Sequence, residues 1–369
     1  MGSHGIKDKV AIIGAGCIPF REHWDKGTDD MLIEAAELTF KSAGVTNGKP
    51  VTRVENFCAT GSEAMRNAAY SLAAGAYDMV MAIGVEKVKD SGYQGLNSTP
   101  TPTDGTGRTL TAAAMYSLIL PAYAHKFGVD EDELRMAMAR IGSKNHFNGA
   151  RNPRAQFRKE MSPESICNMA AVAGRLGVFD CAGVADGAAA VIMVRAEDAK
   201  KYCDDPLYIK ALSFIAGNGS GVTDPDYDYT TFPEIVRCAE DAYRQAGVVD
   251  PRHEIAMAEV HDCFTPTELV LMEDLGFSER GMAWKEVMAG AFDLTGDLPV
   301  NTDGGLKAFG HPIGASGLRM MYEVWLQMRG VAEPERQITT NKKLALTHNL
   351  GGYPGEMVSF VGIYGTELG

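Results

Sequence analysis

The stretch Val51-Thr-Arg-Val-Glu-Asn-Phe-Cys-Ala-Thr-Gly-Ser-Glu-Ala64 decides how the rest of the chain is interpreted. Its start is rich in β-branched residues and its end favours helix, so we predict a strand that turns into a helix at Cys58. A thiol at such a point faces free backbone N–H groups and the positive end of a helix dipole. That setting lowers a thiol pKa and produces a nucleophile, whereas most cysteines are small buried apolar residues. The rest of the chain must decide between these two interpretations.

The composition sets broad limits. The 369 residues, 45% of them hydrophobic, suffice for a large core and for more than one domain. A formal net charge of −13 argues against nucleic acid as a partner, because duplex binding needs a basic face. Seven cysteines without a C-x-x-C pair predict free thiols in a cytoplasmic protein, and no metal site in this chain. No apolar run reaches the roughly 20 residues that cross a bilayer, and the first residues do not resemble a signal peptide.

Apolar strands alternate with helices along the chain, which is typical of an α/β layered sheet. In the first half we predict strands at 10–13, 77–84 and 186–194, and helices at 29–43 and from Cys58 to 74. After a polar linker at 197–206 the pattern restarts, with strands at 207–215, 255–260, 344–349 and 357–363 and helices at 232–246, 265–275 and within 304–330. We therefore predict two similar α/β halves, 1–205 and 206–369, that meet at a shared site.

Residues 88–180 depart from this pattern. A long loop of turn-forming residues at 92–107 precedes helical stretches at 109–126 and 130–146. Long loops inside a compact domain are usually functional, so we interpret 88–180 as an insertion that covers the site.

Two stretches raise the question of a phosphorylated ligand. Gly14-x-Gly16-x-x-Pro19 lacks the third glycine of the dinucleotide-binding fingerprint, so we do not expect a nicotinamide cofactor. The basic stretch 144–159 is either a solvated surface or a site for a phosphate or a partner; its arginines are Arg151, Arg154 and Arg158.

Three histidines in the second half are candidates to assist Cys58. His261 and Cys263 follow a predicted strand and share one face of it, so both would point into a crevice at the carboxyl end of the sheet. His311 lies in a glycine-rich block at the start of a long helix, where the dipole keeps an imidazole neutral. His348 lies at a strand end. For each of these residues the alternative is a buried structural role.

Together these residues predict acyl transfer through a thioester, with an enolate as intermediate. Cys58 is the expected nucleophile and His311 its base. A second thiol, Cys263, suits proton transfer at carbon, because a thiol pKa of about 8.5 lets it take and return a proton near neutrality.

Four blocks resemble the thiolase superfamily, and the likeness spans nearly the whole chain. They are Cys58-Ala-Thr-Gly61, His261-Asp-Cys263-Phe264, Gly310-His-Pro-Ile-Gly-Ala-Ser-Gly317 and His348-Asn-Leu-Gly351. Ordinary thiolases have Asn at the start of the second block and the acid/base cysteine in the last. The histidines and Cys263 here are similar to the sterol-carrier-protein-type and archaeal branch. The resemblance implies the thiolase fold: two βαβαβαββ halves in five layers, with an inserted loop domain at 88–180.

The resemblance also implies catalytic roles. Cys58 would carry the acyl group as a thioester, and His311 would activate it. Cys263 would be the acid/base at carbon. His261 would bind one oxyanion, while the N–H groups of Cys58 and Gly351 would form the other oxyanion hole.

Coenzyme A follows from the same resemblance as a substrate, with no permanently bound cofactor. His348 would line the pocket. The residues expected to contact coenzyme A are Arg151, Arg154, Arg158 and Ser316.

Two further stretches, Glu86-Lys-Val-Lys-Asp-Ser-Gly-Tyr93 and His348–Gly355, are similar to bacterial thiolases that pair with a small zinc-ribbon/OB-fold protein. Thiolases that cleave 2-benzoylsuccinyl-CoA belong to this group. The resemblance implies such a partner, together with homodimers or tetramers. One departure concerns residues 45–50, a short link where the family has a longer segment with a strand. It puts the sheet of the first half and the dimer contact in doubt.

Other functions stay open at this point. A thiolase-fold retro-aldolase acting on a CoA ester would not need Cys58, and a non-catalytic scaffold subunit would need neither Cys58 nor Cys263. The presence of both thiols together with His311 favours an acyltransferase. It would cleave a 3-oxoacyl-CoA with coenzyme A or run the reverse Claisen condensation.

Overall fold

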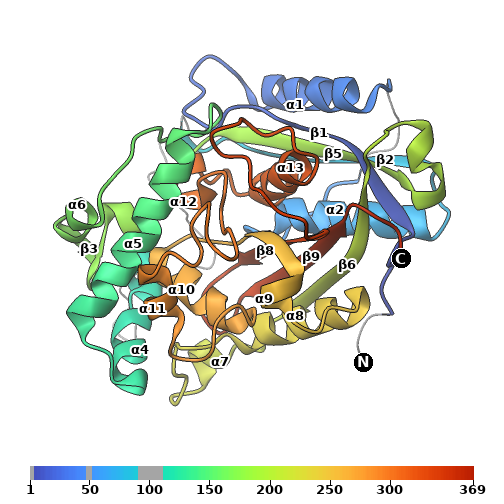
Figure 1. Cartoon of the computed structure of the whole chain (residues 1–369). Coiled ribbons are helices and arrows are strands. Elements are labelled where there is room, and N and C mark those ends of the chain that lie inside the picture. Colours follow the sequence, from blue (N-terminus) through green and yellow to red (C-terminus); the bar gives the residue numbers. More distant parts are fainter. Residues whose placement is uncertain (1–3, 47–51, 90–110) are drawn as a thin grey trace.

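A computed structural model of the chain describes residues 4–46, 52–89 and 111–369. One seven-stranded mixed sheet, in the order β2-β5-β1-β6-β9-β8-β7, runs through it (Figure 1). The first half contributes β1 (Val10–Cys17), β2 (Met79–Glu86) and β5 (Gly187–Arg195). The second half contributes β6 (Leu207–Ala216), β7 (Ile255–Glu259), β8 (Leu344–Gly351) and β9 (Val358–Gly365). Only the β7–β8 pair is parallel among these described strands.

The two groups of strands join through a short antiparallel contact between β1 and β6, at Ala11–Tyr208 and Ile12–Leu207. Helices fill the remaining layers (Figure 1). α1 (Thr28–Ala43) covers β1 and β5, while α8 (Pro233–Ala246) covers β6 and β9. Between the two groups lie α2 (Thr60–Ala73) and α13 (Ser316–Met328). The predicted five layers of a thiolase fold are thus present, although each half has fewer described strands than βαβαβαββ.

The inserted segment forms a helical layer beside the sheet. Its elements are α3 (Ala112–Tyr116), α4 (Ile119–Phe127), α5 (Glu131–Ala150), α6 (Pro163–Cys167), β3 (Ala171–Ala173), β4 (Leu176–Gly177) and the 3₁₀ helix η2 (Val178–Asp180). The predicted helix over 109–126 is therefore two helices, and the loop predicted at 92–107 lies outside the described residues. α5 packs against α10 (Thr265–Asp274), α11 (Ala283–Met288) and α12 (Gly305–Phe309), so the insertion supports the second half directly.

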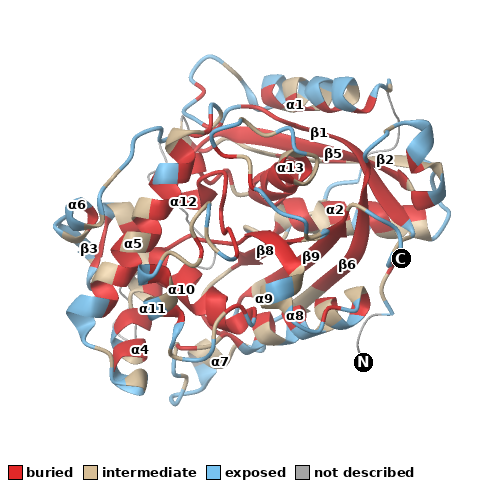
Figure 2. Ribbon diagram, viewed as in Figure 1, coloured by how far each residue is buried: buried red, intermediate tan, exposed pale blue. Residues whose placement is uncertain are grey.

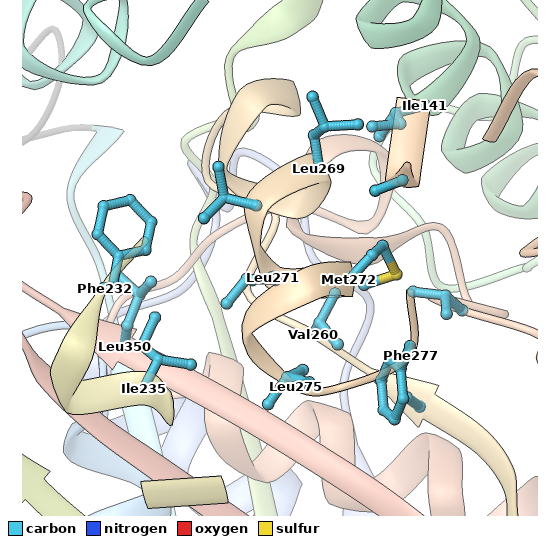
Figure 3. Packing of buried hydrophobic residues seen from close by; sticks show 14 of the residues in the cluster. Ile141, Phe232, Ile235, Val260, Leu269, Leu271, Met272, Leu275, Phe277 and Leu350 are labelled. Carbon is cyan, nitrogen blue, oxygen red and sulfur yellow. The ribbon is translucent and has the colours of Figure 1, made fainter. Parts of the chain in front are cut away.

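Helix α10 lies at the centre of the largest apolar cluster. All ten of its residues are buried, and Figures 2 and 3 show it surrounded by other elements. Leu269 and Met272 pack in the same cluster as Ile141 of α5 and Phe232, which precedes α8. Burial on every side explains why the helix carries apolar residues without a clear stripe. Because α10 begins two residues after Cys263, this packing holds the second thiol in place.

Three short elements complete the structure: η3 (Ala196–Lys201), α7 (Ser220–Thr223) and α9 (Pro251–Glu254). The predicted linker at 197–206 thus begins as a 3₁₀ helix. No helix within the described ranges is both long and apolar enough to cross a membrane.

The strand predicted just before Cys58 does not form in the described residues 52–57, which hold only an isolated bridge from Asn56 to Cys58. Local hydrogen bonds of a turn replace those of a sheet. The Asn56 N–H donates to the Thr60 hydroxyl at 2.7 Å, and that hydroxyl donates to the Phe57 carbonyl at 2.7 Å. Most of the short link at 45–50 lies outside the described residues.

Candidate active site

Cys58 lies in the turn that leads into α2, one residue before the N-cap Ala59. Phe57 has a left-handed backbone conformation with φ of +48°, which sharpens the turn, and Cys58 is partly exposed. Gly351, at the end of β8, packs against this turn. A methyl group there would lie 3.0 Å from the Cys58 nitrogen and 2.9 Å from the Asn56 oxygen. Gly351 is therefore beside the Cys58 backbone, as its expected part in an oxyanion hole requires.

His311 occupies the corresponding turn of the second half, which leads into α13. Gly310 before it has φ of +112°, a conformation that favours glycine, and the His311 N–H donates to the Gly183 carbonyl at 2.7 Å. Glycine also lets the two turns approach each other, because a methyl group at Gly61 would lie 2.9 Å from the Gly314 oxygen. The two glycine-containing blocks thus bring Cys58 and His311 together.

Hydrogen bonds determine which nitrogen of His311 can act as a base. Ser316 donates its hydroxyl hydrogen to the Pro312 carbonyl at 2.9 Å, so its oxygen accepts from Nδ1 of His311 at 2.7 Å. Nδ1 then carries the ring hydrogen. The buried Nε2 has no partner among the described residues and keeps a lone pair. Burial, and after it the charge of Arg319, lowers the pKa of His311 to about 3, so the ring is neutral.

A relay from α2 holds His261 in the opposite tautomer. Ser62 donates to Oδ1 of Asn349 at 3.0 Å, and the amide nitrogen of Asn349 donates to Nδ1 of His261 at 2.7 Å. The hydrogen of the neutral ring therefore lies on Nε2, which is buried and unpaired within the described part of the chain. Burial, followed by His311, lowers the pKa of His261 well below its usual value. His261 thus presents an N–H donor, which suits an oxyanion.

Both rings lie close to the sulfur of Cys58, and in each ring the nitrogen without a hydrogen-bond partner among the described residues is Nε2. This sulfur and one nitrogen each of His261 and His311 lie within 4.8 Å of one another. The two rings meet edge to face, with centroids 5.2 Å apart and planes at 85°. One ring offers a lone pair and the other an N–H group, so the thiol has both a base and a hydrogen-bond donor beside it.

The same thiol and two imidazoles belong to the ligand types that bind zinc. Coordination by His261 would require its Nε2 to lose the hydrogen and the Asn349 amide to turn over, which would reverse the bond to Ser62. The hydrogen-bond relay therefore suits acyl transfer better than metal binding.

The structure overturns one expectation about Cys58. Burial raises its pKa to about 12, and Glu86 is the strongest charge that raises it further. The prediction from sequence was a lowered pKa at a helix N-terminus. Cys58 precedes the N-cap, and the helix-dipole effect falls off within the first turn, so desolvation and a nearby carboxylate dominate. The resting group is a thiol that needs a base to take its proton.

Cys263 is buried in the same site. Desolvation raises the pKa of its thiol, and a charge on Cys58 or Asp262 raises it further. The Thr267 hydroxyl, with its oxygen 3.7 Å from the sulfur, and the Tyr116 hydroxyl oppose this shift. The two thiols are thus close enough for a charge on Cys58 to affect the pKa of Cys263. The contribution of Tyr116 was not predicted, because a single tyrosine in an alanine-rich helix carries no recognisable signal.

His348 lies on β8 behind His261. Its Nε2 is 3.3 Å from the Ser359 hydroxyl, and burial lowers its pKa to about 3. A charge on His348 would lower the pKa of His261, which places the two rings close together. The expected place of His348 in the lining of the pocket stays a prediction.

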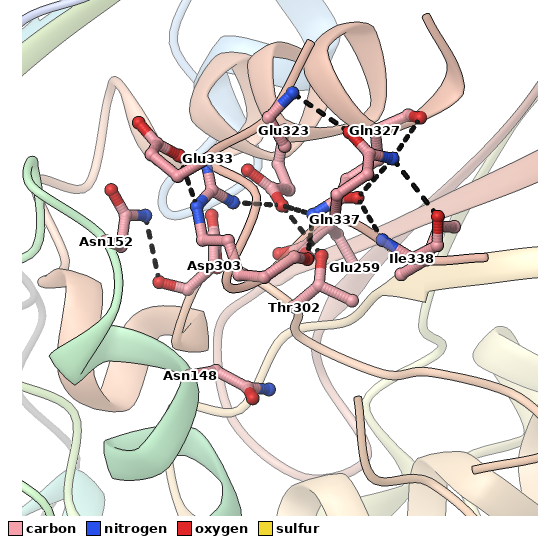
Figure 4. Close-up of polar contacts among 12 residues, drawn as sticks. Asn148, Asn152, Glu259, Thr302, Asp303, Glu323, Gln327, Glu333, Gln337 and Ile338 are labelled. Carbon is pink, nitrogen blue, oxygen red and sulfur yellow. Dashed lines mark hydrogen bonds and ion pairs between the residues drawn. The ribbon is translucent and has the colours of Figure 1, made fainter. Parts of the chain in front are cut away.

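A buried ionic network connects α13 to β7, the strand that precedes His261 (Figure 4). Arg319 of α13 pairs with Glu259 of β7 at 2.9 Å and also with Asp303. Glu323, one turn further along α13, pairs with Arg336. The network ties α13 to the strand before His261. It also places the charge of Arg319 where it disfavours a protonated His311.

Ser316, which was predicted to contact coenzyme A, is buried in the site wall. Its hydroxyl is used twice, as donor to Pro312 and as acceptor from His311. The Ser316 hydroxyl therefore orients the base, and a contact of Ser316 with coenzyme A stays a prediction.

Two of the three arginines predicted to bind coenzyme A form ion pairs within the protein. Arg151 pairs with Glu160 at 2.8 Å, and Arg154 pairs with Glu333 at 3.6 Å. Arg158 is exposed. All three lie in the segment after α5, and their role stays a prediction.

Comparison with known proteins shows the family to which this chain belongs. The thiolase N-terminal domain family matches residues 29–197, and the thiolase C-terminal domain-like family matches residues 222–363. The acetyl-CoA acetyltransferase of Methanothermobacter thermautotrophicus is 33% identical over 94% of this chain and 97% of its own length. The benzoylsuccinyl-CoA thiolase subunit BbsB of Thauera aromatica is 30% identical over 88% of this chain and 82% of its own length.

A solved structure described as an Ltp2-ChsH2(DUF35) aldolase has a TM-score of 0.82 and 21% identity, covering 98% of both chains. At that identity the likeness concerns the fold, and it confirms the predicted fold class. The chain belongs to the thiolase superfamily, in the branch of the archaeal acetyl-CoA acetyltransferases and sterol carrier protein 2.

Proposed function

We propose that this protein is an acyl-CoA C-acyltransferase that works through an acyl thioester on Cys58. It cleaves a 3-oxoacyl-CoA with coenzyme A or catalyses the reverse Claisen condensation. The observation that carries this proposal is the pair of opposite tautomers at Cys58. His311 offers a lone pair and His261 an N–H group, and one nitrogen of each ring lies within 4.8 Å of the sulfur. A thiol of raised pKa needs a base that removes its proton, which the lone pair of His311 provides. A thioester oxygen that becomes negative needs a hydrogen-bond donor, which the N–H group of His261 provides.

The proton movements follow from these positions. In condensation, Nε2 of His311 takes the Cys58 proton as the sulfur attacks an acyl-CoA, and Cys263 protonates the leaving CoA thiolate. Cys263 is then a thiolate and removes a proton from the α-carbon of the second thioester. The Nε2–H of His261 binds the enolate oxygen while the new carbon–carbon bond forms. The bond between the acyl carbon and the Cys58 sulfur then breaks, and His311 returns its proton to that sulfur. Thiolysis runs the same steps in reverse.

We propose coenzyme A as a substrate bound through its phosphates, with the exposed Arg158 as the first candidate on this chain. Guanidinium groups pair well with phosphate because their donors match its oxygens. Arg151 and Arg154 would have to exchange Glu160 and Glu333 for phosphate. No resident cofactor or metal is needed for these steps.

The substrate and the assembly are finer points of the same proposal. One relative is named as a subunit of a benzoylsuccinyl-CoA thiolase, and one similar structure is described as a complex of two proteins. Both support a partner protein, for which the resemblance of the sequence implies the small zinc-ribbon/OB-fold type, and the first supports thiolysis of 2-benzoylsuccinyl-CoA. We also propose that copies of this chain form a homodimer or a tetramer.

Mass spectrometry of the protein after incubation with acetyl-CoA and with longer acyl-CoAs tests the proposal. We expect an acyl adduct on the peptide that contains Cys58, and its loss in Cys58→Ala. A matched control is Cys238→Ala, which removes a buried thiol that bonds the Ser359 carbonyl in the second half. An adduct on another residue, or none with or without a partner protein, would contradict the proposal.

The second candidate function is a retro-aldolase on a CoA ester, and the likeness to a solved aldolase complex favours it. Such an enzyme breaks a carbon–carbon bond next to a hydroxyl group without an acyl-enzyme. Cys58→Ala separates the two, because it would abolish thiolysis but leave aldol cleavage intact. Release of an aldehyde or ketone from a 3-hydroxyacyl-CoA by that variant would favour the aldolase.

A further inference from the structure

Tyr116, at the end of α3, lies near the two thiols and near the end of β8. Tyr116 is 1% exposed, and its ring stacks on Phe264 with centroids 4.8 Å apart and planes at 27°. Phe264 directly follows Cys263, so this stacking holds the phenol beside the acid/base thiol. Helix α3 begins where the Thr111 hydroxyl accepts from the Ala114 N–H, which fixes the short helix that presents Tyr116.

The phenol has one hydrogen and two acceptors within reach. It donates to the Gly352 carbonyl at 3.0 Å, and it lies close enough to Cys263 to lower the pKa of that thiol as a hydrogen-bond donor. A carbonyl is the better acceptor while Cys263 carries its proton, because a thiol sulfur accepts weakly. A thiolate is a charged acceptor, and hydrogen bonds to charged groups are roughly twice as strong as neutral ones. The preferred acceptor therefore changes when Cys263 loses its proton.

Tyr116 remains a donor throughout. Burial, and then negative charge on Cys263 or Cys58, raises its pKa well above the usual value, so the phenol keeps its hydrogen when either thiol ionises. The other groups that act on Cys263 are the charges of Cys58 and Asp262 and the hydroxyl of Thr267. The two charges oppose the thiolate, so the two hydroxyls are what stabilise it.

We propose that Tyr116 is a positioning residue for the acid/base thiol, whose hydroxyl turns from the Gly352 carbonyl to the Cys263 sulfur when that sulfur gives up its proton. The phenol O–H bond does not break. The Cys263 proton leaves with the CoA thiolate, and the rotated hydroxyl stabilises the remaining thiolate until it takes the α-proton of the second substrate. This inference rests on the proposed function for its catalytic meaning, although the hydrogen bond itself does not.

Tyr116→Phe tests this directly, because it keeps the ring that stacks on Phe264 and removes only the hydroxyl. The matched control is Tyr123→Phe on the neighbouring helix α4, which removes an equally buried phenol that bonds Glu273. Thermal unfolding of both variants shows whether they fold.

The first measurement does not depend on the reaction. In a Cys58→Ser background, the rate of alkylation of Cys263 by iodoacetamide is followed by peptide mass spectrometry between pH 7 and 10. Because only the thiolate reacts, Tyr116→Phe should lower this rate about tenfold at each pH, as expected for one hydrogen bond to a charged group. Tyr123→Phe should leave the rate unchanged. Equal rates in both variants would overturn the proposal.

The second measurement follows the reaction in the otherwise native protein. Tyr116→Phe should slow exchange of the acetyl-CoA methyl hydrogens with D₂O about tenfold, and it should slow formation of the acyl adduct on Cys58 by less, because a CoA thiolate can also leave without being protonated. If acylation slows as much as exchange, Tyr116 does not act through the base role of Cys263. If the native protein shows neither acylation nor exchange but alkylation of Cys263 still depends on Tyr116, the proposed function fails and the positioning role stands.

Discussion

Cys58 and Cys263 are two thiols of one site, the first partly exposed and the second buried, and desolvation raises the pKa of both. Their neighbours differ in kind. Cys58 has two imidazoles and the carboxylate of Glu86 near it, whereas Cys263 has two hydroxyl groups. An imidazole can remove a proton, but a hydroxyl can only stabilise the charge that remains. The pKa alone would not distinguish nucleophile from acid/base; the chemistry of the neighbouring groups does.

The largest expected effect comes from removing one thiol only. Cys263→Ala should slow acylation of Cys58 by about tenfold at most, because a CoA thiolate can also leave without being protonated. Condensation and α-proton exchange should fall by about 10²–10⁴, the range for loss of a general acid/base. Acyl adducts are measured by mass spectrometry and exchange by NMR in D₂O. Equal loss of both activities would show that the thiols do not have separate roles.

Removing the base should affect the other thiol. His311→Asn should slow acylation of Cys58 by about 10²–10³, while alkylation of Cys263 keeps its native rate. In the native protein the lowered pKa of His311, about 3, means that Nε2 stays unprotonated as pH falls, until pH approaches that value. The acylation rate should therefore show no inflection near pH 6.5. A histidine inflection at that pH would contradict the structural assignment of a neutral base.

The smallest expected effect concerns the carboxylate beside Cys58. Glu86→Gln removes the strongest charge that raises the pKa of Cys58 but keeps an oxygen that accepts from the Gly314 N–H. Alkylation of Cys58 at pH 8 should become several-fold faster, because a larger fraction of the thiol is ionised. Alkylation of Cys263 serves as the internal control. A slower reaction at Cys58 would mean that Glu86 acts through the fold of the turn instead of its charge.

Much of the fold follows from local patterns. The helix ended by Gly44 and the strands at 10–17 and 187–195 have the apolar runs and stop signals that the structure uses. The strand predicted before Cys58 does not form, because the Thr60 hydroxyl makes hydrogen bonds with the backbone of Asn56 and Phe57. β-propensity does not take account of such local bonds, which compete with the pairing of strands. The pairing of β1 with β6 could not be predicted either, since it joins residues about 200 positions apart.

The candidate site was predictable in its reactive residues but not in their protonation. The blocks around Cys58, His261, Cys263 and His311 were each recognisable as motifs. The raised pKa of Cys58 depends on burial and then on Glu86, which lies on β2, and the tautomer of His261 depends on a bond to Asn349. Such effects arise from tertiary contacts between distant segments, and spacing along the sequence does not report them.

The relay from Ser62 through Asn349 to His261 has a consequence for how such proteins change over time. A hydroxyl encoded early in the chain dictates where a hydrogen sits on a ring encoded 199 positions later. The halves are therefore not interchangeable parts. A chimera that takes its first half from a relative without a hydroxyl at this position inherits an amide free to flip, and with it a histidine whose role is no longer fixed.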